Sequence, residues 1–439
     1  MQFTDIMGLL GGLALFLYGM QMMSTGLEVA AGNKMKQILE KLTTNRFLGI
    51  GMGALITALI QSSSATTVMV VGFVNSGMMT LKQDVWIIMG ANIGTTITGQ
   101  LIALNVGEVA PLIAFVGVAM IVFSKNPKLR YVGNIFAGIG ILFIGMGMMS
   151  DAMKPLQEWP EFINLLSKFE NPLLGIGVGA AFTAIIQSSA ASIGILQTLA
   201  NNGIIALTGA AFVLFGQNIG TCITAFLASI GTNRGAKRAT LIHILFNVIG
   251  TAMFTILCLV TPFVSLVAAS NPGNPAGQIA NMHTIFNIAT TVILIPFGTL
   301  LAYLAEKVLP DKGETVSGQC LQYIPHSVNV QDESLGLSII TMNNARLEIR
   351  RMLAMAIENV ELSFDVFSKS DVKMLPEIEE REDYIDYLNK EISKYISKII
   401  SFESNEKDSA QISAYFKITG NIERIADHAI NICQYTKMH

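Results

Sequence analysis

The sequence predicts an all-α integral membrane protein that carries a soluble helical domain at its C-terminus. Of its 439 residues 51% are hydrophobic and 13% charged, against roughly a quarter charged in ordinary soluble domains. Residues 1–305 hold 22 charges with a net of +4, whereas 306–439 hold 37 with a net of −7. This partition excludes a single soluble enzyme and a nucleic-acid binder. The four scattered cysteines form no disulfide framework and no zinc motif.

Long uncharged runs define the membrane part. About 20 apolar residues suffice for a helix that spans the hydrocarbon core. The first run lacks a basic lead-in and a cleavage site, so we interpret it as a retained span and not as a signal peptide. The runs cover residues 6–27, 47–81, 85–107, 109–124, 131–150, 171–233 and 239–305.

Two segments fit no simple span. Residues 47–81 are too many for one crossing and slightly too few for two, and the polar cluster Gln61–Ser64 lies at their middle. Residues 171–206 repeat this arrangement around Gln187-Ser188-Ser189. Irregular backbone inside a membrane survives only where protein or a watery cavity surrounds it. We therefore predict two helical hairpins that enter the bilayer, turn at the polar cluster and leave on the same side.

The two segments belong to an internal repeat. Adding 126 to a residue number maps Gly49, Gly51 and Gly53 onto Gly175, Gly177 and Gly179 without a gap. The same offset maps Gln61-Ser62-Ser63 onto Gln187-Ser188-Ser189, and Asn92-Ile-Gly-Thr95 onto Asn218-Ile-Gly-Thr221. We predict repeats over about 6–124 and 131–250, followed by an extra span at about 283–305.

Loop charges predict the orientation. With the N-terminus outside, the inward loops 28–46, 125–130 and 234–238 carry the basic residues, and the outward loops 105–108, 151–170 and 263–282 are poor in them. Three crossings precede the second repeat, so we expect it to be inverted relative to the first. Seven crossings would place the C-terminal domain in the cytoplasm. We expect the protein to lie in the inner membrane of the cell.

The repeated polar residues indicate secondary transport, because inverted repeats with broken helices at mid-membrane are typical of secondary transporters. A helix that restarts after each glutamine directs backbone N–H groups and its positive dipole end at the membrane centre, which suits an oxyanion. The two Asn-Ile-Gly-Thr segments contain residues that can open a helix, and carbonyl, amide and hydroxyl oxygens suit Na⁺. Because the uncharged runs contain no acid or base, a carboxylate proton relay is disfavoured.

The motifs resemble the type II sodium-dependent phosphate cotransporters over residues 1–305. The resemblance rests on the two Gln-Ser-Ser blocks together with Gly90–Thr96 and Gly216–Thr221. It implies a non-enzymatic transporter of inorganic phosphate with Na⁺ as the coupling ion, working in a lipid bilayer. The phosphate-site candidates that it implies are Gln61, Ser62, Ser63, Ser64, Gln187, Ser188 and Ser189. The sodium-site candidates are Asn92, Thr95, Thr96, Asn218 and Thr221.

The C-terminal part begins with a polar linker, 306–334, and continues as three amphipathic stretches at about 335–369, 374–403 and 408–436. We predict a three-helix bundle over 335–439. Two Glu-x-x-x-Asp pairs place carboxylates one turn apart, namely Glu382/Asp386 and Glu423/Asp427. Residues 421–428 resemble the PhoU-like phosphate-regulatory domain, which implies metal binding, divalent or iron-type, at these pairs; a solvated, salt-bridged helix face is the alternative.

Alternative functions remain open from the sequence. The protein is predicted to be a sodium-coupled phosphate transporter, but another oxyanion as substrate or net phosphate export fits the same residues. A membrane phosphate sensor that acts through the C-terminal domain is an alternative of a different class. No nucleic-acid partner is expected, and the sequence leaves the oligomeric state, including a homo-oligomer, open.

Overall fold

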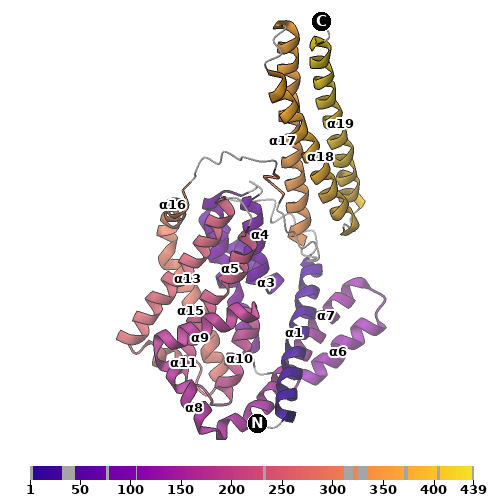
Figure 1. Ribbon diagram of the computed structural model, residues 1–439. Coiled ribbons are helices and arrows are strands. Elements are labelled where there is room, and N and C mark those ends of the chain that lie inside the picture. The colour runs from indigo at the N-terminus through magenta and orange to yellow at the C-terminus, as the bar shows by residue number, and fades with distance from the viewer. Residues whose placement is uncertain are drawn as a thin grey trace. The chain divides into compact units, whose positions relative to one another are not determined.

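The computed structural model describes residues 3–31, 45–75, 79–104, 106–230, 234–310, 320–324, 335–369, 374–402 and 406–437. Within these residues every regular element is a helix, as Figure 1 shows. Six helices are long and apolar enough to cross a membrane, or seven if the bent pair that ends in the segment Pro172–Ile186 counts as one span. The predicted class, an all-helical multi-pass membrane protein, is therefore confirmed.

The chain divides into two compact units. The first, here called the body, comprises 1–71, 79–230 and 235–309. The second, here called the tail, comprises 310–439 together with the short segments 72–78 and 231–234.

The helices of the membrane part follow one another with short breaks. They are α1 (Phe3–Ala31), α3 (Arg46–Ile60), α4 (Ser63–Asn75), α5 (Leu81–Ile102), α6 (Ala110–Phe123), α7 (Pro127–Met153), η1 (Lys154–Glu158), α8 (Pro160–Ser167), η2 (Lys168–Glu170), α9 (Pro172–Ile186), α10 (Ser189–Asn201), α11 (Leu207–Gly220), α12 (Cys222–Ser229), α13 (Arg234–Val260), α14 (Phe263–Ser270), α15 (Pro275–Leu294), η3 (Ile295–Phe297) and α16 (Gly298–Val308).

The hairpin helices have the same boundaries in both halves of the repeat. Moving α3 and α4 along the chain by 126 residues gives the bounds of α9 and α10 residue for residue. The first arms also begin alike, because the side chains of Asn45 and Asn171 accept hydrogen bonds from the first backbone N–H groups of α3 and α9. Just before α9 the chain bends by 106°. In each hairpin the first helix ends at the residue before the glutamine, so both predicted breaks are present at the glutamines.

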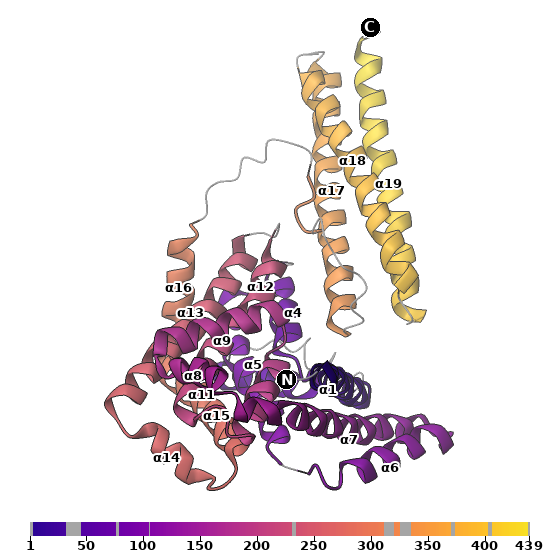
Figure 2. The same ribbon diagram turned by 60° about the horizontal axis from the view of Figure 1, so that its bottom comes forward.

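Helices α1 and α7 pack along their length through glycines, and α6 lies against α7 (Figure 2). A Cβ at Gly12 would lie 2.7 Å from the carbonyl oxygen of Gly145, and one at Gly19 would lie 2.6 Å from that of Gly138. The pairing runs antiparallel, since higher numbers in α1 meet lower numbers in α7. The offset of 126 maps Gly12 onto Gly138 and Gly19 onto Gly145, so the contact is self-complementary, as at an interface with a twofold axis.

Two expectations for the body need correction. The first Asn-Ile-Gly-Thr segment does not open its helix, because α5 runs unbroken through Asn92–Thr96. In the second repeat the helix is interrupted only at Thr221, between α11 and α12. A backbone that stays helical keeps its carbonyls in intrahelical hydrogen bonds, so the predicted supply of free carbonyl oxygens is missing in α5. Helix α16 also continues to Val308, three residues into the range assigned to the linker.

The tail contains α17 (Leu335–Lys369), α18 (Leu375–Phe402) and α19 (Glu406–Lys437), close to the three predicted stretches. Its core is formed by side chains such as Met352, Ile385, Leu388 and Ala426 from all three helices. Glu348 is fully buried there, and it accepts hydrogen bonds from the backbone N–H groups of residues 322 and 323 and an ion pair from Arg351. This satisfied carboxylate attaches the segment 320–324 to the bundle.

Candidate substrate site at the two helix tips

Each hairpin turns at a glutamine in the left-handed backbone conformation. Gln61 has φ 55° and ψ 24°, and Gln187 has φ 58° and ψ 20°. Among the described residues these are the only non-glycine residues with positive φ. Such a conformation costs a residue with a Cβ on the order of 1 kcal/mol or more and persists mainly at functional sites. The strain therefore marks the same two positions that the repeat motif predicts.

The serine after each glutamine caps the second arm of its hairpin. The Ser62 hydroxyl oxygen accepts a hydrogen bond from the Ala65 backbone N–H at 3.1 Å, and the Ser188 oxygen accepts one from Ala191 at 3.2 Å. Both oxygens act as acceptors in these caps, which leaves each hydroxyl proton available to a ligand. An anion at either tip would meet a hydroxyl donor, free N–H groups of the first helical turn and the positive end of the helix dipole.

The first tip is held against α5. Thr98 donates a hydrogen bond to the Gln61 side-chain oxygen at 2.9 Å, and Thr95 donates one to the Ser63 hydroxyl oxygen at 3.2 Å. Gln61 and Ser63 are buried, and Ser64 is half-buried. Of these partners Thr98 escaped the sequence analysis, although it lies one helical turn from Thr95 on the same helix.

The second tip differs from the first in the exposure of its glutamine. Gln187 is exposed, and its side chain makes no hydrogen bond within the described residues comparable to the Gln61–Thr98 bond. Thr221, the repeat counterpart of Thr95, donates to the Asn218 backbone carbonyl at 2.6 Å and not to Ser189, which lies buried at the start of α10. The two tips thus share one backbone geometry, but their side chains make different hydrogen bonds.

The predicted sodium residues are buried close to the tips, but several of their polar atoms already have partners. Asn92 and Thr96 donate to backbone carbonyls one turn back in α5. Asn218 donates to the Leu214 carbonyl, and its side-chain oxygen lies 3.2 Å from Nε2 of His283 and 3.5 Å from the amide nitrogen of Asn287. Asn218 therefore joins α11 to α15.

The tail brings three of the four predicted carboxylates together. One oxygen each from Glu382, Asp386 and Asp427 lie within 4.8 Å of one another, as the ligands of a metal ion would. Glu423 does not belong to this group. Burial, followed by the charges of Asp386 and Asp427, raises the pKa of Glu382 to about 7, and burial with the neighbouring acids also raises the pKa of Asp386. Crowded carboxylates of this kind fit a cation, which would relieve their repulsion.

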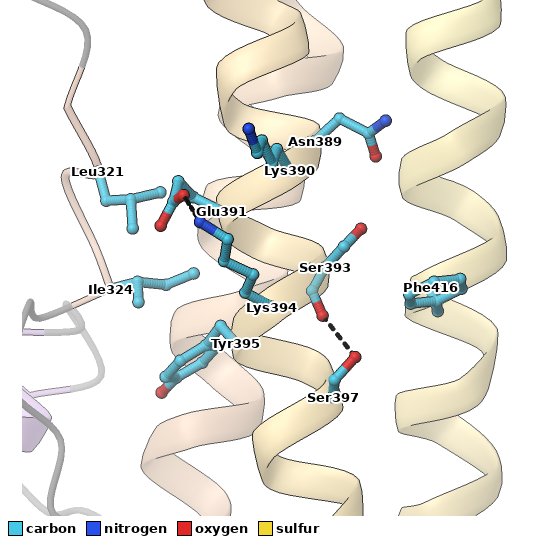
Figure 3. Close-up of a pocket in the computed structure, with 10 residues that line it drawn as sticks. All are labelled: Leu321, Ile324, Asn389, Lys390, Glu391, Ser393, Lys394, Tyr395, Ser397 and Phe416. Atoms are coloured by element: carbon cyan, nitrogen blue, oxygen red, sulfur yellow. Dashed lines mark hydrogen bonds and ion pairs between the residues drawn. The ribbon is translucent and has the colours of Figure 1, made fainter.

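A separate pocket of about 770 Å³ lies in the tail beside α18 (Figure 3). It is lined by Lys390, Lys394 and Ser393 from α18, by Phe416 from α19 and by Leu321 from the attached segment. Glu391 neutralises Lys394 through an ion pair. The pocket is distinct from the carboxylate group.

Comparison with known proteins decides the family. The family model described as Na⁺/Pi-cotransporter matches two segments, residues 15–151 and 153–299, which together exceed half of the chain. The chain belongs to the Na⁺/Pi-cotransporter family. A PhoU domain matches residues 349–436, which include the three clustered carboxylates.

Members of the family from bacteria and animals are similar to parts of the chain or to most of it. The YqeW protein of Bacillus subtilis (strain 168) is 33% identical over 68% of this chain and 96% of its own length. The YjbB protein of Escherichia coli (strain K12), whose name describes inorganic phosphate export, is 24% identical over 96% of this chain and 76% of its own length. Human sodium-dependent phosphate transport protein 2B is 39% identical over 23% of this chain and 15% of its own length. No solved structure matches.

Proposed function

We propose that this member of the family is a sodium-coupled secondary transporter of inorganic phosphate, with the anion held between the two hairpin tips. The observation that carries the proposal is the pair of left-handed glutamines, Gln61 and Gln187, each followed by a serine that caps a new helix. Ser63, Ser64 and Ser189 extend the polar surface at the starts of α4 and α10. These groups suit an anion because they are hydrogen-bond donors arranged around the N-terminal ends of two helices.

Two features of the body support alternating access as part of the proposal. The repeat-related helices α1 and α7 run antiparallel, which supports an inverted arrangement of the two halves. Gln61 at the first tip accepts a hydrogen bond from Thr98, whereas Gln187 at the second tip is exposed. In an inverted-repeat transporter the two tips exchange these environments when the protein switches the side on which it is open.

Sodium coupling is proposed because an unaccompanied anion is energetically costly in the low-dielectric interior of a membrane. The test is uptake of radiolabelled phosphate by proteoliposomes under an inward Na⁺ gradient, with choline replacing Na⁺ as the control. We expect saturable uptake that disappears with choline. Phosphate binding without uptake would favour the sensor alternative, and sulfate or arsenate that competes fully with phosphate would favour a broader oxyanion substrate.

The orientation is a further part of the proposal: N-terminus outside, tail in the cytoplasm and the hairpins entering from opposite sides of the inner membrane. Ser76, at the expected cytoplasmic end of the first hairpin, lies outside the described residues, so the reporter position is Thr80, the exposed N-cap of α5. In a chain without native cysteines, Thr80→Cys should be protected from an impermeant external thiol reagent and Asn202→Cys should react. Labelling of both from one side contradicts the inverted arrangement.

Net export is the second candidate function. The favouring observation is that the Escherichia coli relative named for phosphate export aligns with 96% of the chain, tail included. Cells loaded with labelled phosphate should release it faster when they carry the protein, if export is its direction. Unchanged efflux together with Na⁺-driven accumulation supports import.

For the tail we propose a metal site at Glu382, Asp386 and Asp427, with Glu423 one turn away on α19 as an outer residue. The mutual approach of the three oxygens supports it. Such a site would hold a divalent or iron-type ion and supply positive charge to a domain that otherwise carries an excess of acids.

A further inference from the structure

The two hairpins differ in a pair of hydroxyl groups behind their tips. In the first hairpin Thr57 of α3 donates a hydrogen bond to Thr66 of α4 across 3.0 Å, and both side chains are buried. The offset of 126 maps this pair onto Thr183 of α9 and Ser192 of α10. Thr183 and Ser192 are both fully buried, yet neither hydroxyl oxygen has a hydrogen-bond partner in the described structure.

A third unpartnered oxygen belongs to Gln217 on the neighbouring helix α11. The amide nitrogen of Gln217 in α11 donates to the Ser192 backbone carbonyl at 3.0 Å, which places the end of the Gln217 side chain next to Ser192. The Gln217 oxygen is buried and has no partner among the described residues. The first repeat has no such group, because the residue that corresponds to Gln217 is Ala91.

We propose that Thr183, Ser192 and Gln217 form a Na⁺-binding site behind the second tip, a site that the first repeat lacks. The inference deepens the proposed function, on which it rests for the identity of the coupling ion. It also moves the proposed ion from Asn218 to the adjacent Gln217. The polar atoms of Asn218 already have partners in α11 and α15.

The ligand chemistry favours a monovalent cation, which the proposed function identifies as Na⁺. Three neutral oxygens are hard ligands, and the absence of a carboxylate among them argues against Ca²⁺ or Mg²⁺, which are usually held with carboxylate help. Thr183 also lies in the last turn of α9, where the helix dipole presents its negative end. The same hairpin thus offers the negative end of α9 to a cation and the positive end of α10 to the anion. Opposite helix ends therefore face the two ions at this tip, so the helix dipoles repel neither ion.

The geometry also explains why the buried oxygens tolerate their lack of partners. A buried polar atom without a hydrogen bond is destabilising, so three of them on adjacent helices are a substantial penalty. A cation that binds all three removes this penalty. Positions 91 and 66 in the first repeat avoid it by a different route, through an alanine and a closed hydroxyl pair.

The test uses the first repeat as the template for its control. The double variant Ser192→Thr/Gln217→Ala gives the second hairpin the residues of the first, a combination that already packs stably in this chain. Na⁺ binding is measured on the purified full-length protein, without phosphate, as the rise in melting temperature when NaCl replaces choline chloride. We expect the half-saturating Na⁺ concentration to rise at least about tenfold, equal to roughly 1.4 kcal/mol. Gln157→Ala, an exposed glutamine, should leave the Na⁺ titration unchanged.

A further variant separates ligand loss from general damage. Gln217→Glu keeps an oxygen at the same place, and its protonated form can still donate to the Ser192 carbonyl, so Na⁺ binding should persist. The site assignment is overturned if the double variant and Thr183→Val both retain the wild-type Na⁺ titration. The Na⁺ titration contains no phosphate, so it can be interpreted even if the wild type fails to transport phosphate. A Na⁺ response without phosphate transport would overturn the proposed function but not the Na⁺ site.

Discussion

At the scale of the residue, Ser62 and Ser188 each combine a structural bond with a ligand-facing proton. The cap bond uses the hydroxyl oxygen, whereas phosphate recognition would use the hydroxyl hydrogen. Mutations at these serines therefore mix a loss of helix stability with a loss of affinity. Variants that preserve one of the two bonds can separate the effects.

For Ser188→Ala we expect phosphate affinity to fall by about 10- to 150-fold, the equivalent of a roughly 1.5–3 kcal/mol hydrogen bond to a charged group. Loss of the cap adds a stability cost of about 1 kcal/mol. Ser188→Thr should restore both properties. Ser188→Asp should restore the cap but repel phosphate. Equilibrium binding of labelled phosphate and the melting temperature measure the two effects, and equal phosphate affinity in the alanine and wild-type proteins contradicts the assignment.

Glu382 predicts a pH dependence in the tail. Its pKa is raised from 4.5 to about 7, by burial first and then by Asp386 and Asp427. A metal ion must displace the proton, so Mn²⁺ affinity should fall as the pH drops through about 7. Without metal, the folded state holds a proton that the unfolded chain releases above its lower pKa. The stability contribution of this group should therefore decrease as the pH rises from 4.5 to about 7.

The measurement is calorimetric titration of Mn²⁺ into the full-length protein between pH 6 and 8. Glu382→Gln should bind Mn²⁺ weakly and with little dependence on pH, while the exposed Glu380→Gln on the same helix should behave as the wild type. A steep pH dependence that survives in Glu382→Gln would assign the proton to another carboxylate.

At the scale of the element, the contact between α1 and α7 depends on glycine. A Cβ at Gly145 would lie 2.5 Å from both the Gly12 carbonyl oxygen and the Phe16 backbone nitrogen. Two residues further along the same helix, Gly147 has nothing within 4 Å. Close approach of helix backbones through small residues is a common way for membrane helices to associate.

These neighbours provide a matched pair of variants. Gly145→Ala should force the two helices apart at a cost on the order of 1–3 kcal/mol, as overpacking does elsewhere. Gly147→Ala should be neutral or stabilising, because alanine is favoured over glycine inside a helix by about 0.5–1 kcal/mol. Melting temperatures of the purified variants give the comparison. Equal destabilisation by both would mean that the packing of α1 on α7 is not glycine-dependent.

At the scale of the whole molecule, the two hairpin tips and the carboxylate group fall into separate units. Both tips, the helices that hold them and all of the candidate membrane spans end by Val308. Arg238 donates to the Leu309 carbonyl, which secures the end of α16 to the start of α13. The metal-type carboxylates and the tail pocket come after this point.

A chain that stops after Pro310 should therefore still insert and carry phosphate with Na⁺ coupling, because it retains both tips and the Arg238 contact. Its rate, or its response to cytoplasmic metal, should change if the tail regulates the body. The measurement is Na⁺-driven phosphate uptake in proteoliposomes alongside the full-length protein. A truncated chain that folds and binds phosphate but transports none would show that the tail takes part in the transport cycle.

Local features of the sequence were sufficient for the helical class, the two tips and the tail helices. Gln61 and Gln187 stand out because an offset of 126 aligns them without a gap, and both are helix breaks in the structure. The prediction that Asn92–Thr96 would open α5 was wrong, because glycine and threonine lower helix propensity without overriding a well-packed helix. Gln217 was visible in the second motif, and its mismatch with Ala91 was the signal that could have drawn attention to it.

What the sequence alone determined is what depends on composition, period and repetition: a membrane body, two equivalent hairpins, an acidic helical tail and a family. Only the tertiary structure decided that Thr98 engages one tip while Gln187 stays exposed, that Gln217 meets Ser192 and that Glu423 stays outside the group of three carboxylates. These outcomes depend on contacts between helices distant in the sequence. Helix period restricts which face a side chain occupies, but the rotation and approach of the neighbouring helix decide which atoms on that face meet.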